Sequence, residues 1–173
     1  TVNVHVEYRR ANQVYEDVLG NVVDLGLVAY PTKDSKIDVI PLRKETLVLI
    51  AHPNHPLAKQ KSVRLSQLAG QKFIGFEPDI PTRKAIDKVF KDHDVEVQHV
   101  MEFDNIETVK RAVEIEAGIS IVPLGTISQE VSKHTLAEIK IEDADLYRPL
   151  AAIYKKNKVL SPAMRQFLNI LKG

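Results

Sequence analysis

Two polar pairs, Thr82-Arg83 and Asp104-Asn105, have the residue types and spacing best suited to binding a small ligand. Each pair precedes a segment whose apolar residues recur at helical spacing, so each is expected at a helix N-terminus. The first backbone N–H groups of a helix have no partner within it, and they attract anions. Thr82 would add a hydroxyl to such a site, and Arg83 a positive charge for a carboxylate. The alternative for both pairs is structural, as helix caps and a solvated arginine.

Other candidate contacts follow apolar runs that are typical of buried strands, at positions where ligands of open α/β sheets bind. Tyr30 to Thr32 follow one such run, and Pro123 and Leu124 follow another, where they would form an apolar wall. Tyr8 and Arg9 follow an alternating run near the N-terminus, but they could equally lie on the surface. For a small polar or anionic ligand, the sequence predicts contacts from Tyr30, Pro31, Thr32, Pro81, Thr82, Arg83, Asn105, Ile106, Pro123 and Leu124.

Metal and catalytic chemistry have little support in the sequence. His52 and His55 bracket a Pro-Asn loop, but no third ligand stands at suitable spacing, and the chain has no cysteine. There is no G-x-S-x-G elbow, no glycine-rich phosphate loop and no distinctive carboxylate pair. We therefore predict no metal, no cofactor and no enzymatic activity.

The composition is that of an ordinary globular protein, with 44% hydrophobic and 27% charged residues in 173. Because 24 Lys and Arg balance 23 Asp and Glu, no general field draws this chain to DNA or to an anionic membrane. No run approaches the roughly 18 continuous apolar residues of a membrane span. The N-terminus does not read as a signal peptide, although the chain opens inside a strand pattern without a methionine.

The most informative stretch runs from Phe103 to Pro123. Asp104 is the expected N-cap of a helix, with Glu107 completing a capping box. Gly118 is expected to end this helix in the left-handed conformation, and residues 119–122 then form a buried strand.

The rest of the pattern predicts an α/β protein with two sheets, each built from βαβ units. A helix containing Val14, Val18 and Leu19, closed by Gly20, would join residues 2–7 to residues 24–30 as a parallel crossover. Further strands are expected at residues 38–42, 46–51, 73–76, 95–102, 136–141 and 146–154, and further helices after Thr82, at residues 126–133 and from Ser161-Pro162 onward.

Three segments, DNIETVKRAVEIEAGISIVP, LVLIAHPNHPLA and DLGLVAYP, together resemble the effector-binding domain of LysR-type transcriptional regulators. The resemblance covers essentially the whole chain in the right order. It implies a fold like the type 2 periplasmic binding proteins, with a ligand cleft between two α/β subdomains. The first subdomain would contain residues 1–50 and 149–173, and the second residues 51–148, with strand crossings near Leu49–Ala51 and Leu150–Ala151.

The resemblance also implies a function, which is to sense an effector in the cytoplasm of a bacterium and relay its binding to a winged helix-turn-helix domain. That DNA-binding domain is absent from this sequence. We expect the full-length protein to contact DNA only through that domain. The first strand and helix of the effector domain would precede Thr1. A homodimer is expected, in which residues 2–7 of one chain approach residues 95–102 of the other. The alternative function is an extracytoplasmic solute-binding protein that serves a transporter.

One residue departs from the family pattern. Glu116 stands where the family often has a glycine, and we expect Glu116 to extend the helix so that the turn depends on Gly118 alone.

Overall fold

The longest strand of the computed structural model is β2 (Ile37–Ala51), which organises the fold. The sequence predicted two separate strands here, but the backbone continues as one strand through Pro41. The structure describes residues 3–172. By their contacts these residues form two units, residues 3–44 with 149–172, and Glu45–Arg148. Both β2 and the late strand β8 (Tyr147–Lys155) contribute residues to both units.

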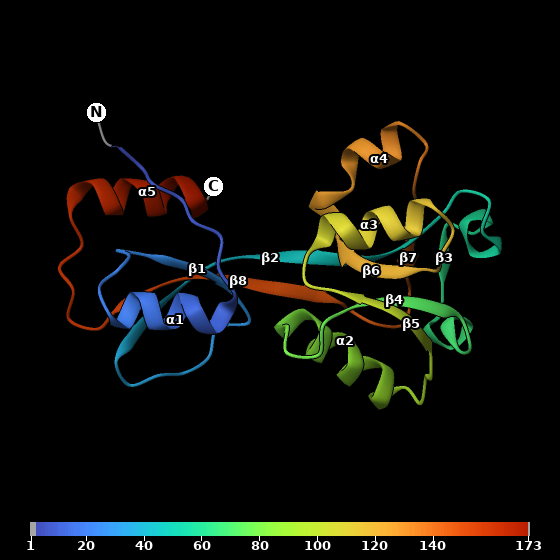
Figure 1. The fold of residues 1–173 in the computed structure, drawn as a ribbon, viewed down its shortest axis with the longest axis horizontal. Helices are drawn as coiled ribbons and strands as arrows, with labels where there is room; N and C mark the ends of the chain where they lie inside the picture. Colours follow the sequence, from blue (N-terminus) through green and yellow to red (C-terminus); the bar gives the residue numbers. More distant parts are fainter. Residues whose placement is uncertain (1–2, 173) are drawn as a thin grey trace. The chain divides into compact units, whose positions relative to one another are not determined.

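The second unit contains a sheet in which β2 is a central strand (Figure 1). On one side, β2 pairs antiparallel with β7, which pairs parallel with β3. On the other side, β2 pairs antiparallel with β6, and β6 adjoins β4 through a parallel bridge between Ile119 and Phe73. β4 in turn pairs parallel with β5. The bounds are β3 (Ser62–Val63), β4 (Lys72–Phe76), β5 (Gln98–Phe103), β6 (Ser120–Pro123) and β7 (Ala137–Ile141).

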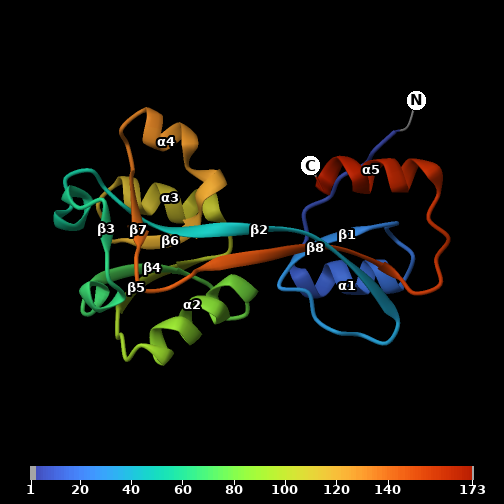
Figure 2. The same cartoon turned by 180° about the vertical axis from the view of Figure 1, so that it is seen from behind.

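Alternating residues of β2 form two apolar cores, one on each face of this sheet. Leu47 and Leu49 face the core that includes Ile86 and Phe90 of α2 (Pro81–Asp92). Val48 and Ile50 face the other core, with Val109 and Val113 of α3. Figures 1 and 2 show α2 on one side of these strands, and α3 (Ile106–Glu114) with α4 (Ser128–Ser132) on the other. Short 3-10 turns complete the unit at η1 (Pro56–Lys59), η2 (Leu65–Leu68) and η3 (Leu124–Thr126).

The first unit is smaller and is built around the pairing of β1 (Gly26–Ala29) with β8. Helix α1 (Ala11–Leu19) ends at Gly20, as predicted, and packs Val14 and Val18 against this sheet. A Cβ on Gly26 would lie 2.5 Å from Val14 Cγ1, so only glycine allows this close approach. The final helix, α5 (Pro162–Lys172), begins with the predicted cap, in which Ser161 Oγ accepts from the N–H of Met164 at 3.2 Å.

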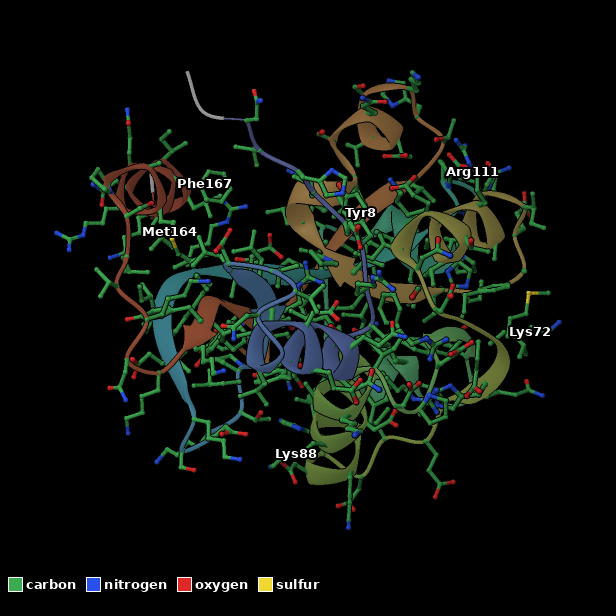
Figure 3. All side chains as sticks on the ribbon, turned by 60° about the vertical axis from the view of Figure 1, so that its left-hand side comes forward. Tyr8, Lys72, Lys88, Arg111, Met164 and Phe167 are labelled. Atoms are coloured by element: carbon green, nitrogen blue, oxygen red, sulfur yellow. The ribbon has the colours of Figure 1, made fainter. Side chains whose placement is uncertain are left out.

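The predicted N-terminal strand is wrong. Residues 3–10 form neither a strand nor a helix, and Val2 lies outside the described residues. Val4 and Val6 are exposed, and Tyr8 is 96% exposed on the extended segment before α1 (Figure 3). Alternation of apolar residues produces a strand only where a neighbouring strand accepts its hydrogen bonds. The parallel crossover predicted for this unit is therefore also wrong, since β1 pairs antiparallel with β8.

The end of α3 also differs from the prediction. Glu116, expected to extend the helix, instead has a φ of 63° and ends it in the left-handed conformation. Gly118 does not have a positive φ. Its role is steric, because a Cβ there would lie 2.5 Å from the carbonyl oxygen of Lys72 in β4. Gly118 therefore allows β6 to begin beside β4.

Within residues 3–172, no helix is both long and apolar enough to cross a membrane.

Candidate functional site

Three of the four predicted ligand-binding segments leave the same edge of the second unit's sheet. The parallel neighbours β4 and β5 end together, since Phe76 is paired with Phe103. β6 is parallel to β4, so it also ends at this edge, with Pro123. α2 follows β4, α3 follows β5 and η3 follows β6. We call this the carboxyl edge, defined by residues 81–83, 105–106 and 123–124.

The N-terminus of α2 presents an unpartnered hydroxyl group and free backbone donors. Pro81 is the first helical residue and has no N–H, and the preceding Ile80 supplies no side-chain cap. Lys84 N–H makes the first helical bond, to the carbonyl of Ile80 at 3.2 Å. Thr82 is 4% exposed as a residue, and its hydroxyl has no hydrogen-bond partner among residues 3–172. The hydroxyl oxygen is not itself enclosed, since the one buried side-chain polar atom without a partner in these residues is Glu130 Oε2. The Thr82 hydroxyl is therefore open to a ligand that offers a donor or an acceptor.

Arg83 is neither a solvated surface residue nor a free cation at this edge. It is 8% exposed, and its Nη1 donates to the carbonyl of Phe76 at 2.6 Å and to Glu102 at 2.7 Å. Its Nε donates to Asp87 at 2.7 Å. Burial opposes the charge on Arg83, but the bonds with Glu102 and Asp87 outweigh that cost and raise its pKa. These contacts place the Arg83 guanidinium beneath the first turn of α2.

The N-terminus of α3 is capped by Asn105, and the predicted cap at Asp104 is wrong. Asn105 Oδ1 accepts from the N–H and the hydroxyl of Thr108, both at 2.9 Å. Asp104 instead accepts from the side-chain amide of Asn105 at 2.8 Å. The predicted capping box also fails, because Glu107 pairs with Lys110. Two backbone donors at the start of α3, those of Ile106 and Glu107, have no partner within the part of the chain that the structure describes.

The turn after β6 gives this edge an apolar surface. Pro123 is buried as the last residue of β6, whereas Leu124 is 38% exposed at the start of η3. The hydroxyl of Thr126 donates to the carbonyl of Pro123 at 2.7 Å and fixes the turn. The second unit therefore combines free N–H groups, an unpartnered hydroxyl and an apolar side chain, which suits a small molecule with a carboxylate or several hydroxyls.

The remaining predicted segment, Tyr30 to Thr32, belongs to the first unit. Tyr30 directly follows β1 with a φ of 50°, and its N–H donates to the carbonyl of Pro149 at 2.8 Å. Thr32 N–H donates to the hydroxyl of Tyr15 at 2.9 Å, which ties this loop to α1. The Thr32 side chain is exposed. This loop is therefore held by its backbone and can offer side chains to a ligand.

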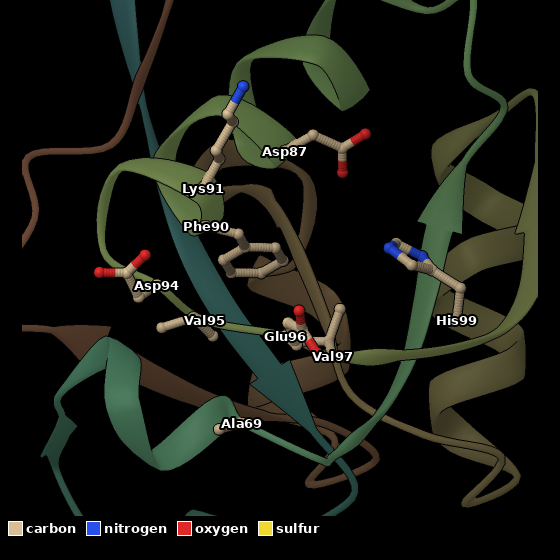
Figure 4. Close-up of a pocket in the computed structure, with 9 residues that line it drawn as sticks. All are labelled: Ala69, Asp87, Phe90, Lys91, Asp94, Val95, Glu96, Val97 and His99. Atoms are coloured by element: carbon tan, nitrogen blue, oxygen red, sulfur yellow. The ribbon is translucent and has the colours of Figure 1, made fainter.

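A hollow of about 670 Å³ lies at the other end of α2 and contains none of the predicted contacts (Figure 4). Its lining comes from the last turns of α2 and the chain leading into β5, and it includes Asp87, Asp94 and Glu96. Its three carboxylates outnumber its one lysine, Lys91, which disfavours an anion, and the hollow is open to solvent. The carboxyl edge is therefore a better candidate than this hollow for the site of an anionic ligand.

The histidine pair makes structural bonds. His52 Nδ1 lies 3.1 Å from Glu116, and His55 Nδ1 accepts from the N–H of Leu57 at 3.2 Å to cap η1. Over residues 3–172 there is no group of three or more His, Cys, Asp or Glu placed to hold a metal ion.

The sequence reasoning did not single out Lys110, which is 4% exposed on α3 beside this edge. A lysine on the buried face of the α3 pattern, four residues after Ile106, was the available signal.

Comparison with known proteins gives a consistent result. A family model described as LysR substrate binding domain matches residues 1–173. A RuBisCO operon transcriptional regulator of Allochromatium vinosum is 33% identical over 85% of this chain and 49% of its own length. The transcriptional activator CmpR of Synechocystis is 29% identical over 98% of this chain and 56% of its own length. The chain thus spans about half the length of these relatives.

Solved structures agree with the family match. The regulatory domain of CcmR from Synechocystis PCC6803 in complex with 2-PG has a TM-score of 0.83 and 27% identity, covering 94% of this chain and 78% of that one. The effector-binding domain of QuiR in complex with shikimate has a TM-score of 0.82 and 25% identity, covering 94% of this chain and 77% of the QuiR chain. These neighbours confirm the predicted α/β fold, which is like that of the type 2 periplasmic binding proteins.

Proposed function

The chain belongs to the LysR substrate binding domain family, and from this premise we propose that it is the effector-sensing domain of a bacterial transcriptional regulator. The observation that carries the proposal is the unpartnered hydroxyl of Thr82 at the carboxyl edge, beside free N–H groups of α2 and α3. Helix N-termini favour negative charge, and hydroxyls and amides select oxygen-rich ligands. The proposed effector is a small polar or anionic metabolite.

The relatives support this class of ligand. CcmR was solved with 2-PG and QuiR with shikimate. In the proposed site, Thr82, Asn105, Ile106 and the apolar pair Pro123 and Leu124 contact the effector from the second unit. Pro81 shapes the start of α2, and Arg83 secures it from beneath. We propose Tyr30, Pro31 and Thr32, which lie in the first unit, as further effector contacts.

The proposed response is a shift between two arrangements of the subdomains. A ligand changes such an equilibrium only by the difference in its affinity for the two states. An effector with higher affinity for one arrangement would raise the population of that arrangement. A winged helix-turn-helix domain elsewhere in the whole protein would receive that change and bind DNA.

The rival function, a solute-binding protein for a transporter, has less support because the relatives named above are regulators. Membership of the LysR family also favours a binding domain without enzymatic activity. It likewise favours a regulator that works in the cytoplasm. A gel-shift experiment with the whole protein and promoter DNA distinguishes the regulator from the solute-binding protein. The regulator should slow the migration of the DNA, and its effector should alter that shift. A whole protein that binds no DNA would contradict the regulator.

We also propose a homodimer. The prediction paired residues 2–7 with residues 95–102, but the first segment is not a strand. We propose β5 as part of the dimer contact, because β5 is the edge strand of its pair with β4, and Val100 and Met101 are 37% and 41% exposed. Sedimentation equilibrium on the whole regulator should show a dimer or a higher oligomer. A strict monomer at all concentrations would contradict this part of the proposal.

The site is tested with the variant Thr82→Val, which removes the hydroxyl but keeps the side-chain shape. A thermal-shift screen of small organic acids and phosphate esters, including 2-PG and shikimate, first finds a ligand that stabilises the wild-type protein. Calorimetry with that ligand should then show a loss of about 0.5–1.5 kcal/mol for a neutral partner, or roughly 1.5–3 kcal/mol for a charged one.

Thr135→Val is the matched control, since its hydroxyl bonds Glu114 at the opposite end of α3. It should leave the affinity unchanged. Unchanged affinity in folded Thr82→Val would place the ligand elsewhere, and a screen without any stabilising acid or ester would contradict the proposed ligand class.

A further inference from the structure

Lys110 is a charged side chain in an apolar environment. It is 4% exposed on the face of α3 that also carries Val109 and Val113. Moving an ammonium group out of water is costly unless oxygen atoms replace the water. Oxygen atoms of the protein must therefore take the place of water around the Lys110 ammonium group.

Three oxygen atoms from three segments satisfy the ammonium group. Lys110 Nζ lies 2.9 Å from Glu107 Oε1 in the first turn of α3. It donates to the carbonyl of Thr126 in η3 at 2.8 Å and to Glu130 Oε1 in α4 at 2.9 Å. Burial opposes the charge, but Glu107 and Glu130 outweigh that cost and raise the pKa of Lys110. The ammonium can donate only three hydrogen bonds, so its capacity is fully used.

Two of the three segments border the carboxyl edge. Glu107 carries one of the free N–H groups of α3, and Thr126 lies two residues after Leu124. The bond to Thr126 is to a main-chain carbonyl, so it fixes the backbone of the turn rather than a mobile side chain. The third segment, α4, is tied in through Glu130, whose Oε2 is buried without a partner among the described residues. Among the described residues, Lys110 is the one side chain that donates a hydrogen bond to the Glu130 carboxylate.

The arrangement around Arg83 beneath α2 is equivalent. Arg83 also bonds one main-chain carbonyl, that of Phe76, and two carboxylates, those of Asp87 and Glu102. Each helix N-terminus at the carboxyl edge is thus secured to its neighbours by one buried cation. Shared chemistry at two different helices indicates that the spacing of this edge is fixed by these cations.

We infer that Lys110 is a positioning residue for the effector site, holding the first turn of α3 and the turn 124–126 at the spacing that an effector needs. The inference rests on the proposed function, because it concerns the same site. Lys110 itself does not contact the effector. Its effect on affinity acts through the direction of the Ile106 and Glu107 N–H groups and through the placement of Leu124.

The test uses the double variant Lys110→Met with Glu130→Gln. Replacing both partners avoids a buried unpaired carboxylate, which could unfold the single variant. The matched control is Lys88→Met with Asp92→Asn. It removes a Lys–Asp pair on α2 whose side chains are 75% and 51% exposed, and Figure 3 labels Lys88 on this helix. Circular dichroism checks that both variants are folded.

The first readout needs no ligand. Amide hydrogen exchange at Thr108, Val109 and Ile127, whose N–H groups are hydrogen-bonded within these segments, should be at least about tenfold faster in the Lys110 variant than in the control, because the tie between the segments is lost. If exchange at these amides matches wild type in the folded variant, the inference is wrong, whatever the protein binds.

The second readout is affinity for 2-PG and for shikimate, measured by calorimetry. We expect the affinity of whichever probe binds wild type to fall about tenfold in the Lys110 variant and to stay unchanged in the control. Unchanged affinity, together with a loss in Thr82→Val, would overturn the positioning role while the proposed site stands. Unchanged affinity in both variants would overturn the site itself. If neither probe binds wild type, the exchange readout alone decides the inference.

Discussion

Glu116 ends helix α3 with a φ of 63°, a conformation that costs a residue with a Cβ about 1–2 kcal/mol. What it gains in return is small. Its carboxylate lies 3.1 Å from His52 Nδ1, but its side chain is 60% exposed, and exposed ion pairs contribute little. At the residue scale, the chain therefore carries local strain directly after a strongly amphipathic helix.

Glu116→Gly should accordingly stabilise the protein by about 0.5–1 kcal/mol, after allowing for the greater freedom of glycine in the unfolded chain. Urea unfolding of the variant and the wild type measures the difference. Glu116→Ala is the control, since it removes the carboxylate without relieving the strain, and it should not stabilise. A Glu116→Gly protein less stable than wild type would mean that the contact with His52 matters more than the backbone strain.

At the scale of elements, the join between β6 and β4 depends on the absence of a side chain at Gly118. The N–H of Ile119 donates to the carbonyl of Lys72 at 2.9 Å, and the N–H of Ile74 donates to the carbonyl of Ile119 at 2.8 Å. These bonds bring the two strands together directly beside Gly118. They also align the ends of β4 and β6, from which the carboxyl edge is built.

Gly118→Ala should destabilise the protein by roughly 1–3 kcal/mol, because its Cβ would press on the carbonyl oxygen of Lys72, and backbone gives way at greater cost than a flexible side chain. Gly125→Ala is the matched control. A Cβ on Gly125 meets nothing within 4 Å, and its φ is not positive. Thermal unfolding compares the two variants. Equal unfolding midpoints for the two variants would show that β4 and β6 can move apart slightly without loss of stability.

At the scale of the whole molecule, two histidines with lowered pKa values, His55 and His99, make stability depend on pH. Burial lowers the pKa of His55, against a hydrogen bond with Gln71. Burial also lowers the pKa of His99, and the nearby charge of Arg83 lowers it further. Both folded pKa values therefore lie below the ordinary value of 6.5.

Because the unfolded chain takes up these protons first, the stability due to neutral His55 and His99 is present above pH 6.5. It should be lost as pH falls through the folded pKa values. Urea unfolding at about pH 7.5 and about pH 5.5 measures the decline. His99→Gln should flatten it, whereas the exposed-site variant His134→Gln should not. Stability that rises toward pH 5.5 would contradict the direction of both shifts.

Local patterns in the sequence determined most of the elements of this protein. Helix spacing, caps and apolar runs are set by neighbours a few residues away, which is why α2, α3, β6 and α5 lie close to their predicted positions. The three family segments also indicated the fold class before any contact was known. The same local signals marked the ends of β4, β5 and β6, and so the carboxyl edge.

Tertiary structure decided what depends on distant partners. An alternating run such as residues 3–7 becomes a strand only beside another strand, and none is paired with it. Asn105, not Asp104, caps α3 because backbone geometry selects between adjacent good caps. Arg83 and Lys110 are buried because Glu102 and Glu130, 19 and 20 residues further along the chain, provide the oxygen atoms that replace their water. No periodicity within a single helix records such pairings, because they exist only once the chain has folded.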